Sequence, residues 1–424
     1  MLVLASILII TTVVVEFAYN AHVAYDVAAA QRDQLKAYYL ARSALNLIKL
    51  ELRSERQLRQ QFAGMLSQLA KTDLTSDPLC KTYPLSTGIL QGLSSGLLTN
   101  ATGSEADKTP EAPKQEEEKK AVSEEKSDPF DLGGDFEATC DTEERKINLN
   151  AFYRRPGASD SQPTPGATSS GYDEQKNLLV ALFSQKAFEP IFNGHRDEIL
   201  KVVGAIADWA DADERTNEVP GISGGLEEEA YSGLGYKPKN GKYEDTSELL
   251  LVPGVGDQLY RLLEPSVTVF GDNKLNVCQA DGDTLRAFLL NYSLTTPGAS
   301  RLNPEDEPKM LSLVQSLKLV CQKANPQSID VANAITSVLG GSAGTETPGS
   351  GSSTRNRSRR GQDASNPPPG AQGTGLVGKI STTNRFFSVE AVGEVGEQKV
   401  TIRAVLDAQS PAPTPWKTVY FQVR

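Results

Sequence analysis

The sequence predicts an α+β fold, in which one long N-terminal helix is combined with a small antiparallel sheet and a large inserted all-helical domain. Three observations support this prediction. The chain begins with an apolar run that becomes amphipathic, and no Pro or Gly occurs before Gly64. Apolar residues recur at helical spacing between residues 174 and 340. After residue 386, β-branched and aromatic residues roughly alternate with polar ones in three short stretches.

The N-terminal stretch, residues 1–52, is expected to be a membrane and assembly helix. Its apolar part extends over about 17 residues, which at roughly 1.5 Å per residue gives about 25 Å, just short of a hydrocarbon core. Farther along, Tyr38, Ala41, Leu45, Ile48 and Leu52 recur at helical spacing among basic residues. We therefore expect the front of the helix to lie in lipid and its back to face protein. The side chains assigned to the membrane and assembly part are Leu2, Leu4, Leu8, Val15 and Glu16.

Two simpler interpretations of this stretch fit less well. A secretory signal peptide has a basic start and a small-residue cleavage site. Here the first basic residue is Arg32, and the small residues 28–30 lie too far beyond the apolar run. A plain membrane anchor would not need an amphipathic continuation without a linker.

Composition narrows the functional classes. The chain has 424 residues, and 43 basic against 54 acidic residues give a net charge of −11. This argues against a general nucleic-acid binder, whose surface is basic. The four cysteines show no zinc-type spacing, so behind a membrane anchor we expect two disulfides in an oxidising compartment. Four cysteines allow three pairings, and we favour the two that close local segments; free buried thiols are the alternative. These pairs are Cys80–Cys140 and Cys278–Cys321.

Changes in composition divide the chain after the helix. Residues 53–155 form the first part of the sheet-bearing region, interrupted by a mixed-charge tract at 101–129 that is too polar to fold by itself. Residues 174–340 form the inserted helical domain, residues 341–375 a Gly/Ser-rich flexible linker, and residues 376–424 the closing strands.

Local patterns predict the individual elements. Two extended runs around the polar residues 141–144 predict a hairpin. Residues 196–209 place their apolar side chains on one helical stripe, and Asp245 with Glu248 predicts a capping box at a helix start. Asn303 and Pro304 predict the cap and first turn of a later helix. Residues 386–392, 398–405 and 418–423 predict an antiparallel meander.

Several segments together resemble the minor pseudopilin K family of type II secretion systems. Behind the apolar helix they occur in this order: Ile147–Asn150, Asp208–Asp213, Glu227–Tyr231, Ser247–Val255 and Leu275–Val277. The resemblance implies a pilin-like sheet that carries a large helical domain. It also implies a single-pass inner-membrane protein with a periplasmic head. Its implied place is the tip of a pseudopilus built with minor pseudopilins I, J and H and the major pseudopilin, on an inner-membrane secretion platform.

The sequence departs from the family at its start. Members are made with a short basic leader that ends in Gly, and no such leader is visible here. Most pilins carry Glu at the fifth mature position, whereas this position is Ala5 if Met1 is the first mature residue. K subunits are similar in lacking this Glu. Glu16 is at a different position and would need a partner in a helix bundle or a place near the membrane interface.

An acidic, Gly-rich loop around residues 211–225 is the best candidate for chemistry. Hard cations take several oxygen ligands, and such a loop can wrap one, although its spacing is not that of an EF-hand. Relatives in the resembled family carry calcium in this domain. The matching carboxylates are Asp211, Asp213, Glu227 and Glu228. In the alternative interpretation, Asp208 bonds to backbone and the other carboxylates lie in a solvated loop.

Residues 251–256 with Tyr260 resemble a helix-hairpin-helix, whose backbone amides bind phosphate in DNA-binding proteins. Acidic residues surround this hairpin, so we expect it to pack rather than bind nucleic acid. A membrane-anchored DNA-uptake protein is the alternative function. An enzyme is not expected, because the only two histidines, His22 and His195, are isolated and no nucleophile elbow or phosphate loop accompanies them.

Overall fold

The computed structural model describes residues 2–69, 77–92, 133–153, 171–296, 298–303, 306–323, 326–340, 375–409 and 416–424. Packing separates the chain into two compact units. We call Met1–Gln61, Pro78–Asp141 and Phe387–Arg424 the sheet unit, and Phe62–Asp77 with Thr142–Phe386 the helical unit. The predicted acidic insertion at 101–129 and the predicted linker at 341–375, apart from Gly375, lie outside the described residues.

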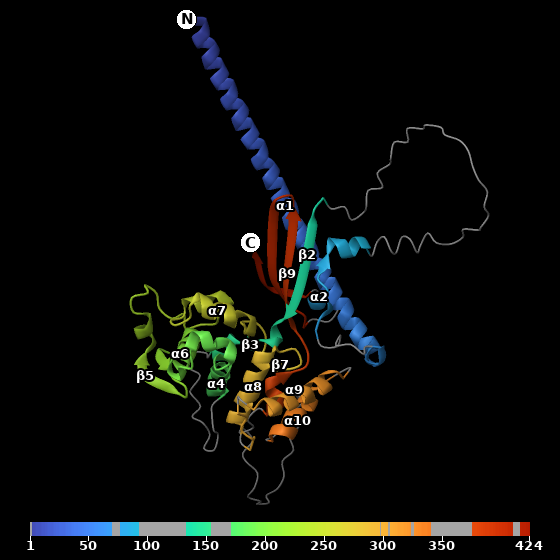
Figure 1. The fold of residues 1–424 in the computed structure, drawn as a ribbon, viewed down its shortest axis with the longest axis vertical. Helices are drawn as coiled ribbons and strands as arrows, with labels where there is room; N and C mark the ends of the chain where they lie inside the picture. Colours follow the sequence, from blue (N-terminus) through green and yellow to red (C-terminus); the bar gives the residue numbers. More distant parts are fainter. Residues whose placement is uncertain are drawn as a thin grey trace, which may run out of the picture. The chain divides into compact units, whose positions relative to one another are not determined.

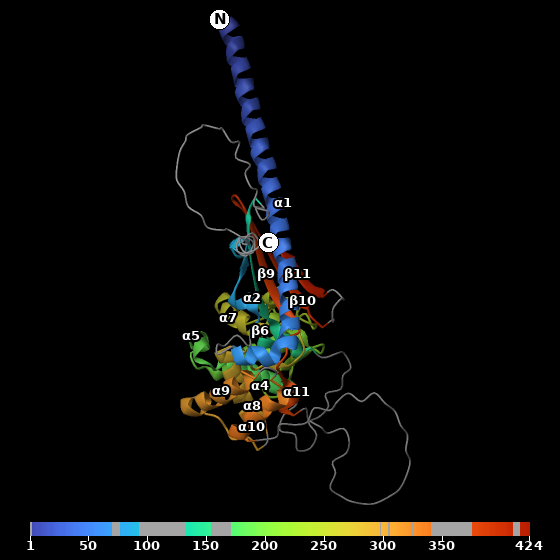
Figure 2. The ribbon, with the colours of Figure 1, turned by 90° about the vertical axis from the view of Figure 1, so that its right-hand side faces the viewer.

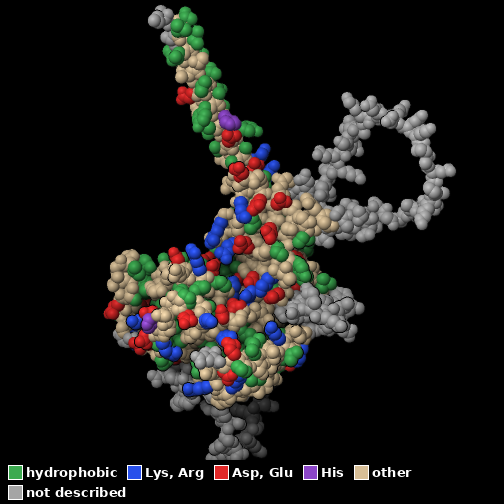
Figure 3. All heavy atoms as spheres, viewed as in Figure 1, with side chains coloured by type: hydrophobic (Ala, Val, Ile, Leu, Met, Phe, Trp, Pro, Cys, Tyr) green, Lys and Arg blue, Asp and Glu red, His purple; other side chains and the backbone are tan. Residues whose placement is uncertain are grey.

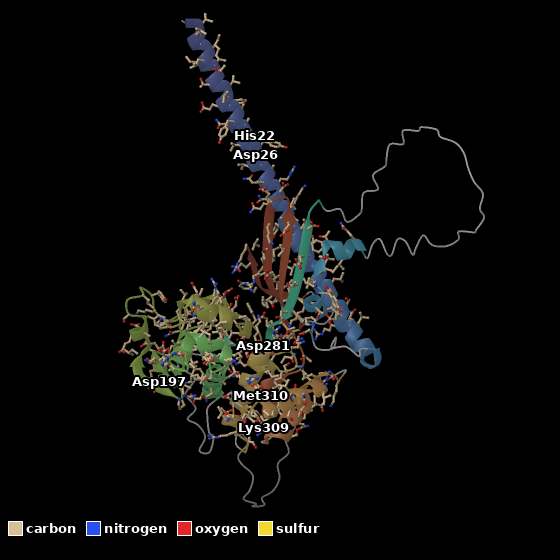
Figure 4. All side chains as sticks on the ribbon, in the orientation of Figure 1. His22, Asp26, Asp197, Asp281, Lys309 and Met310 are labelled. Carbon is tan, nitrogen blue, oxygen red and sulfur yellow. A yellow bond between two sulfur atoms is a disulfide. The ribbon has the colours of Figure 1, made fainter. Side chains whose placement is uncertain are left out.

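The predicted N-terminal helix is confirmed as one continuous helix, α1, which spans Leu2–Leu69. Its first half exposes its apolar side chains, including Leu4 at 70%, Leu8 at 67% and Val15 at 67% (Figure 3). By length and composition, Ser6–Leu58 contains a stretch able to cross a membrane. On the same half, His22 and Asp26 lie one turn apart, with 3.5 Å between Nε2 and Oδ2 (Figure 4).

A five-stranded sheet follows α1 in the sheet unit, with strand order β1-β2-β9-β10-β11 (Figures 1 and 2). The pairs β1–β2 and β10–β11 are antiparallel. The predicted C-terminal meander is confirmed as β9, β10 and β11. The elements of this sheet and the short helix beside them are α2 (Leu79–Thr82), β1 (Leu85–Ser86), β2 (Asp135–Thr142), β9 (Phe386–Val395), β10 (Gln398–Asp407) and β11 (Lys417–Val423).

Small side chains allow α1 to pack closely on this sheet. Ala37, Ala41 and Ala44 recur along the buried stripe of the helix and are fully buried. On β9, a Cβ added to Gly393 would lie 2.1 Å from the carbonyl oxygen of Ala37, so only glycine fits there. Such a close approach fills the core without voids. The second half of α1 therefore belongs to the core of the sheet unit.

The helical unit has a second hydrophobic core, formed mainly by α4, α6, α8, α9 and α10. Asp281 caps α8, where its side chain accepts a hydrogen bond of 2.7 Å from the Thr284 N–H (Figure 4). The helices of this unit, apart from the end of α1, are η1 (Glu143–Arg145), η2 (Leu149–Phe152), α4 (Gly171–Phe183), η3 (Lys186–Phe188), α5 (Glu189–Phe192), α6 (Arg196–Ala210), η4 (Glu227–Tyr231), η5 (Thr246–Leu251), α7 (Asp257–Leu263), η6 (Glu264–Ser266), α8 (Gly282–Thr295), α9 (Glu307–Cys321), α10 (Ser328–Leu339) and α11 (Leu376–Lys379).

The helical unit also contains short strands whose pairing the sequence pattern did not predict. Two of the three pairs are parallel bridges of two residues each, too short to leave a periodic signal. The third is an antiparallel hairpin inside the stretch predicted as an acidic loop. The pairs are β3 (Ile147–Asn148) with β6 (Val267–Thr268), β4 (Arg215–Asn217) with β5 (Ile222–Leu226), and β7 (Leu275–Asn276) with β8 (Ile380–Ser381).

The predicted hairpin around residues 141–144 is wrong. Strand β2 joins the five-stranded sheet, whereas β3 pairs with β6. The polar turn between them is buried instead of solvated, and the Glu144 carboxylate accepts the N–H groups of Arg385 and Phe386 at 2.9 and 2.8 Å. Burial raises the pKa of Glu144 to about 7. These bonds to a distant segment direct the chain away from its neighbour β2.

Two predicted helix starts have different outcomes. The capping box of Asp245 and Glu248 is confirmed at the start of η5. The predicted cap at Asn303 is wrong, because α9 begins at Glu307, with Asp306 as its cap and Pro308 in its first turn. Pro304 lies outside the described residues.

Both disulfides have the pairing that the sequence favours. Cys80–Cys140 lies in the sheet unit, and Cys278–Cys321 lies in the helical unit. Each closes a loop within one unit, with sequence separations of 60 and 43 residues. Each disulfide therefore restricts the unfolded chain of its own unit.

Candidate metal centre

Three buried carboxylates meet at the end of α6, and we call Asp208, Asp211 and Glu227 the carboxylate cluster. Asp208 and Asp211 are three residues apart, which places them on one side of the last helical turn. The β4–β5 hairpin then returns the chain, and Glu227 follows β5 directly. One oxygen from each residue lies within 4.8 Å of the others.

Two polar side chains hold the aspartates. The Asn217 backbone N–H and its Nδ2 both donate to Asp208 Oδ1, each at 2.7 Å. Asn217 Nδ2 also donates to Asp211 Oδ2 at 2.8 Å, and the Tyr172 hydroxyl donates to the same oxygen at 2.9 Å. Three buried oxygens remain without a hydrogen bond, namely Asp211 Oδ1 and both carboxylate oxygens of Glu227.

The electrostatics of the cluster favour a bound positive charge. Burial raises the pKa of Asp208 to about 7. Burial and the neighbouring Asp211 raise the pKa of Glu227 well above its usual range, and burial also raises that of Asp211. The C-terminal end of α6 adds the negative partial charge of its unpaired carbonyls. Without a cation, protons must neutralise part of this cluster.

A fully buried lysine fixes the loop that carries Asn217. Lys176 of α4 donates from Nζ to Asn217 Oδ1 at 3.3 Å, to the Glu218 carbonyl at 2.8 Å and to the Gly221 carbonyl at 2.7 Å. Its charge is balanced by Asp173, with 3.1 Å between Nζ and Oδ1. Lys176 therefore positions Asn217, which in turn orients the two aspartates.

The resemblance implies four carboxylates as calcium ligands, and the structure brings two of them together. Asp211 and Glu227 belong to the cluster. Asp213 lies outside it and accepts the Arg215 N–H at 2.8 Å, while Glu228 is exposed and pairs with Lys237 at 2.5 Å. Asp208 bonds to backbone, as the alternative interpretation held, and it is also the third member of the cluster.

Sequence reasoning missed Tyr172, Lys176 and Asn217. Tyr172 and Lys176 come from a helix about 40 residues upstream, so no local spacing connects them with the acidic stretch. Asn217 lies inside that stretch, but it carries no charge, so the sequence predicts only that it belongs to a loop. The available signal is the pattern of α4, because Lys176 is a polar residue on the helical face that otherwise carries apolar side chains.

The donor set fits a hard cation. Calcium takes oxygen ligands at about 2.3–2.6 Å, so two ligands of one ion lie at most about 5 Å apart. The cluster meets this limit, and its three unbonded buried oxygens could supply part of the six to eight oxygen ligands that calcium takes. Asp211 and Glu227 would hold the ion, with Asp208 beside them.

Together, the exposed apolar helix and the two folded units define an α+β protein suited to membrane anchoring. Residues 145–272 match the family model described as "Type II secretion system (T2SS), protein K". Residues 145–272 are thus similar to protein K of type II secretion systems, and the resemblance seen in the sequence is confirmed. The matched region contains the whole carboxylate cluster.

Two curated relatives share this description. The type II secretion system protein K of Klebsiella pneumoniae is 30% identical over 175 residues, which are 40% of this chain and 48% of that protein. The protein K of Pectobacterium carotovorum subsp. carotovorum is 26% identical over 135 residues, which are 30% of this chain and 40% of that protein. The alignments thus span less than half the length of these relatives.

A solved structure also matches at low similarity. It is the crystal structure of the GspK-GspI-GspJ complex from the type 2 secretion system of enterotoxigenic Escherichia coli. The match covers 88% of this chain and 99% of that chain, with 15% identity and a TM-score of 0.40. The similarity to protein K therefore rests on the sequence comparisons.

We predict that Lys176→Met lowers the free energy of unfolding by about 3 kcal/mol, because it leaves the half-buried Asp173 carboxylate and three carbonyl acceptors without their shared donor. Urea denaturation followed by tryptophan fluorescence measures the change. Lys186→Met, at an exposed position 10 residues later, serves as the matched control and should change stability by less than about 0.5 kcal/mol. Equal stability of the two variants would contradict the role given to Lys176.

We also predict a specific pH dependence in chelator. The folded-state pKa of Asp208 is about 7, above its usual 3.8, so the folded state holds a proton that the unfolded state releases. The contribution of Asp208 to stability is therefore complete below about pH 4 and is lost as the pH rises through about 7. Asp208→Asn keeps an acceptor for Asn217 and should remove this loss, which we expect to be on the order of 2 kcal/mol.

Urea midpoints of wild type and Asp208→Asn between pH 4 and 8 test this prediction. The difference between the two proteins reports the titration of Asp208 together with its electrostatic effect on Asp211 and Glu227. Glu229→Gln, at an exposed position of η4, is the control and should follow wild type. Parallel pH profiles for wild type and Asp208→Asn would refute the predicted coupling.

Proposed function

We propose that this chain is a minor pseudopilin of a type II secretion system, located at the tip of the pseudopilus. One observation carries the proposal: α1 is a single helix whose first half exposes apolar side chains and whose second half is buried against a sheet. This arrangement suits a subunit that leaves the bilayer to pack against the helices of other subunits. The protein K domain at residues 145–272 supports the same assignment.

The proposed mechanism is an exchange of apolar surroundings. In the bilayer, lipid covers side chains such as Leu4, Leu8 and Val15. In the filament, neighbouring helices cover them, so extraction keeps most of the hydrophobic stabilisation. The helical unit is large enough to prevent further subunits from adding above it. The protein nucleates or caps the filament and does not itself catalyse a reaction.

The proposed partners are minor pseudopilins I, J and H, the major pseudopilin and the inner-membrane secretion platform. The solved complex named above contains GspK, GspI and GspJ. The proposed location is the bacterial inner membrane with both folded units in the periplasm. The two disulfides support this location, because they persist in oxidising compartments.

We further propose that the carboxylate cluster binds calcium as a structural staple. The ion would compensate two of the negative charges that the three buried carboxylates can carry, and it would bind the oxygens that lack hydrogen bonds. Lys176 and Asn217 orient the ligands before the ion arrives. The ion would link the end of α6 to the end of β5 and thereby stabilise the protein K domain.

No observation favours the alternative of a DNA-uptake protein. The hairpin between η5 and α7 packs inward at Gly254, whose φ is +86° and whose added Cβ would lie 2.9 Å from Val202. Beside the hairpin, Glu248 forms an ion pair with Lys239 at 2.9 Å, so the positive charge of Lys239 is already compensated. These contacts give the segment a packing role.

We predict that Leu8→Arg abolishes assembly. An Arg near the middle of a membrane helix costs about 2.5–3.5 kcal/mol on insertion, and it also disrupts packing in the filament. In a strain that lacks the native chain, secretion of a type II substrate should fall at least 10-fold, and co-purification with the I and J subunits should be lost. Leu319→Arg, 70% exposed on α9, serves as the control and should retain both activities.

Normal secretion by a strain that lacks the chain would contradict the proposed function. So would a wild-type protein that does not associate with the I and J subunits in detergent.

We predict that calcium stabilises the protein and that the cluster is responsible. At a calcium concentration 100-fold above Kd, the gain in unfolding free energy is about 2.7 kcal/mol. Asp211→Asn and Glu227→Gln should remove the rise in melting temperature caused by calcium. Glu228→Gln is the matched control, because Glu228 is exposed and outside the cluster. Melting curves with calcium and with chelator that coincide for wild type would refute the calcium proposal.

A further inference from the structure

A groove of about 520 Å³ lies between α1 and the edge strand β11, within the sheet unit. On the α1 side, Tyr38, Arg42, Leu45 and Lys49 line it, spaced by 4, 3 and 4 residues along one face of the helix. On the other side, residues 418–421 of β11 line it. The groove begins where the buried stripe of α1 meets the side of the sheet.

Strand β11 offers an unpaired edge. It is the last strand in the order of the sheet, and β10 is its partner on one side among the described strands. Arg424 and Thr401 exchange both backbone hydrogen bonds, each at 2.9 Å. Along an antiparallel ladder, hydrogen-bonded pairs of residues alternate with pairs that are not hydrogen-bonded. Phe421 and Val423 belong to pairs of the second kind, so their N–H and C=O groups point away from β10.

Side chains at this edge are apolar and exposed. Val419, Phe421 and Val423 are 37%, 47% and 46% exposed. Proteins usually protect an edge of this kind with charges, proline or a covering segment, because it is a template for another strand. Beyond the register shift of the ladder, the stretch from Tyr420 to Val423 is regular. This stretch is long enough to pair with another strand.

The charge of the groove identifies the chemistry of its occupant. The described lining residues include the cations Arg42 and Lys49 and no carboxylate. Lys49 Nζ donates to Thr418 Oγ1 at 3.5 Å, a neutral acceptor. Four positions beyond Lys49, Arg53 adds a third cation over the Trp416 ring. A complementary partner therefore brings carboxylates.

We propose that the groove receives an extended, acidic segment of a neighbouring pilin-type subunit, which pairs with the free edge of β11 and places its carboxylates against Arg42 and Lys49. Backbone pairing explains why the occupant is a peptide strand, and the exposed side chains set its register. A second copy of this chain does not offer a matching strand at the other edge of this sheet, because β1 has two residues. The inference rests on the proposed function, which supplies the neighbouring subunits.

The test uses the full chain in detergent, mixed with full-length I-type and J-type minor pseudopilins of the same bacterium. A photo-crosslinking amino acid at position 421 should join to an acidic, extended segment of one of them. Phe421→Pro removes an N–H that faces away from β10, so the ladder to β10 is kept. It should weaken binding of that subunit at least 10-fold, whereas Phe421→Val should bind within about 3-fold of wild type.

A second variant tests the charge independently of the strand. Arg42→Glu with Lys49→Glu should weaken binding at least 10-fold and reverse its salt dependence. Lys399→Glu, an exposed residue of β10 in the same unit, is the matched control and should leave binding unchanged. Melting temperatures confirm that each variant is folded.

The outcomes separate this inference from the proposed function. If wild type associates with the I or J subunit but Phe421→Pro and the charge variant bind equally well, the groove proposal is wrong and the proposed function stands. Crosslinks from position 421 to a second copy of this chain or to anionic lipid also overturn the groove proposal. If wild type associates with neither subunit, both are wrong.

Discussion

The structure depends on one constraint: a single helix must be stable in two different surroundings. The first half of α1 exposes Leu8 and its neighbours, which need lipid or other helices around them. The second half lies so close to β9 that Gly393 and Ala37 leave no room for a Cβ. Because α1 continues without a break between the halves, any movement of the apolar half is transmitted directly to the sheet.

The helical unit is organised around a different requirement, the compensation of buried charge. Asp208, Asp211 and Glu227 converge at a helix end that is itself negative, and on α4 Lys176 balances Asp173. One buried cation is thus already part of the polypeptide, and we propose that the cluster binds another. Both arrangements fix the β4–β5 hairpin against α4 and α6, which explains how an acidic, Gly-rich stretch is ordered.

Much of the fold can be read from the sequence, because its signals are local. The periodicity of α1 and α6, the alternation of β9 to β11 and the capping box at Asp245 lie within short windows. The β3–β6 and β7–β8 bridges have no such signal, since each joins two residues across more than 100 positions. For the same reason, only part of the site can be predicted from the sequence. Asp211 and Glu227 lie in the acidic stretch, whereas Tyr172 and Lys176 reach it from α4.

The sheet unit is discontinuous in sequence, and this sets an order of folding. Strand β2 ends at Thr142, and β9 begins at Phe386, so the sheet requires a closed loop of about 240 residues, whose entropy makes early closure unfavourable. The helical unit between these points is nearly contiguous, and Glu144 binds the amides of Arg385 and Phe386 at its two ends. Once it folds, it has already brought β2 and β9 together. A chain that emerges from its N-terminus onwards therefore completes its insert before its sheet, because β9, β10 and β11 all follow the insert in sequence.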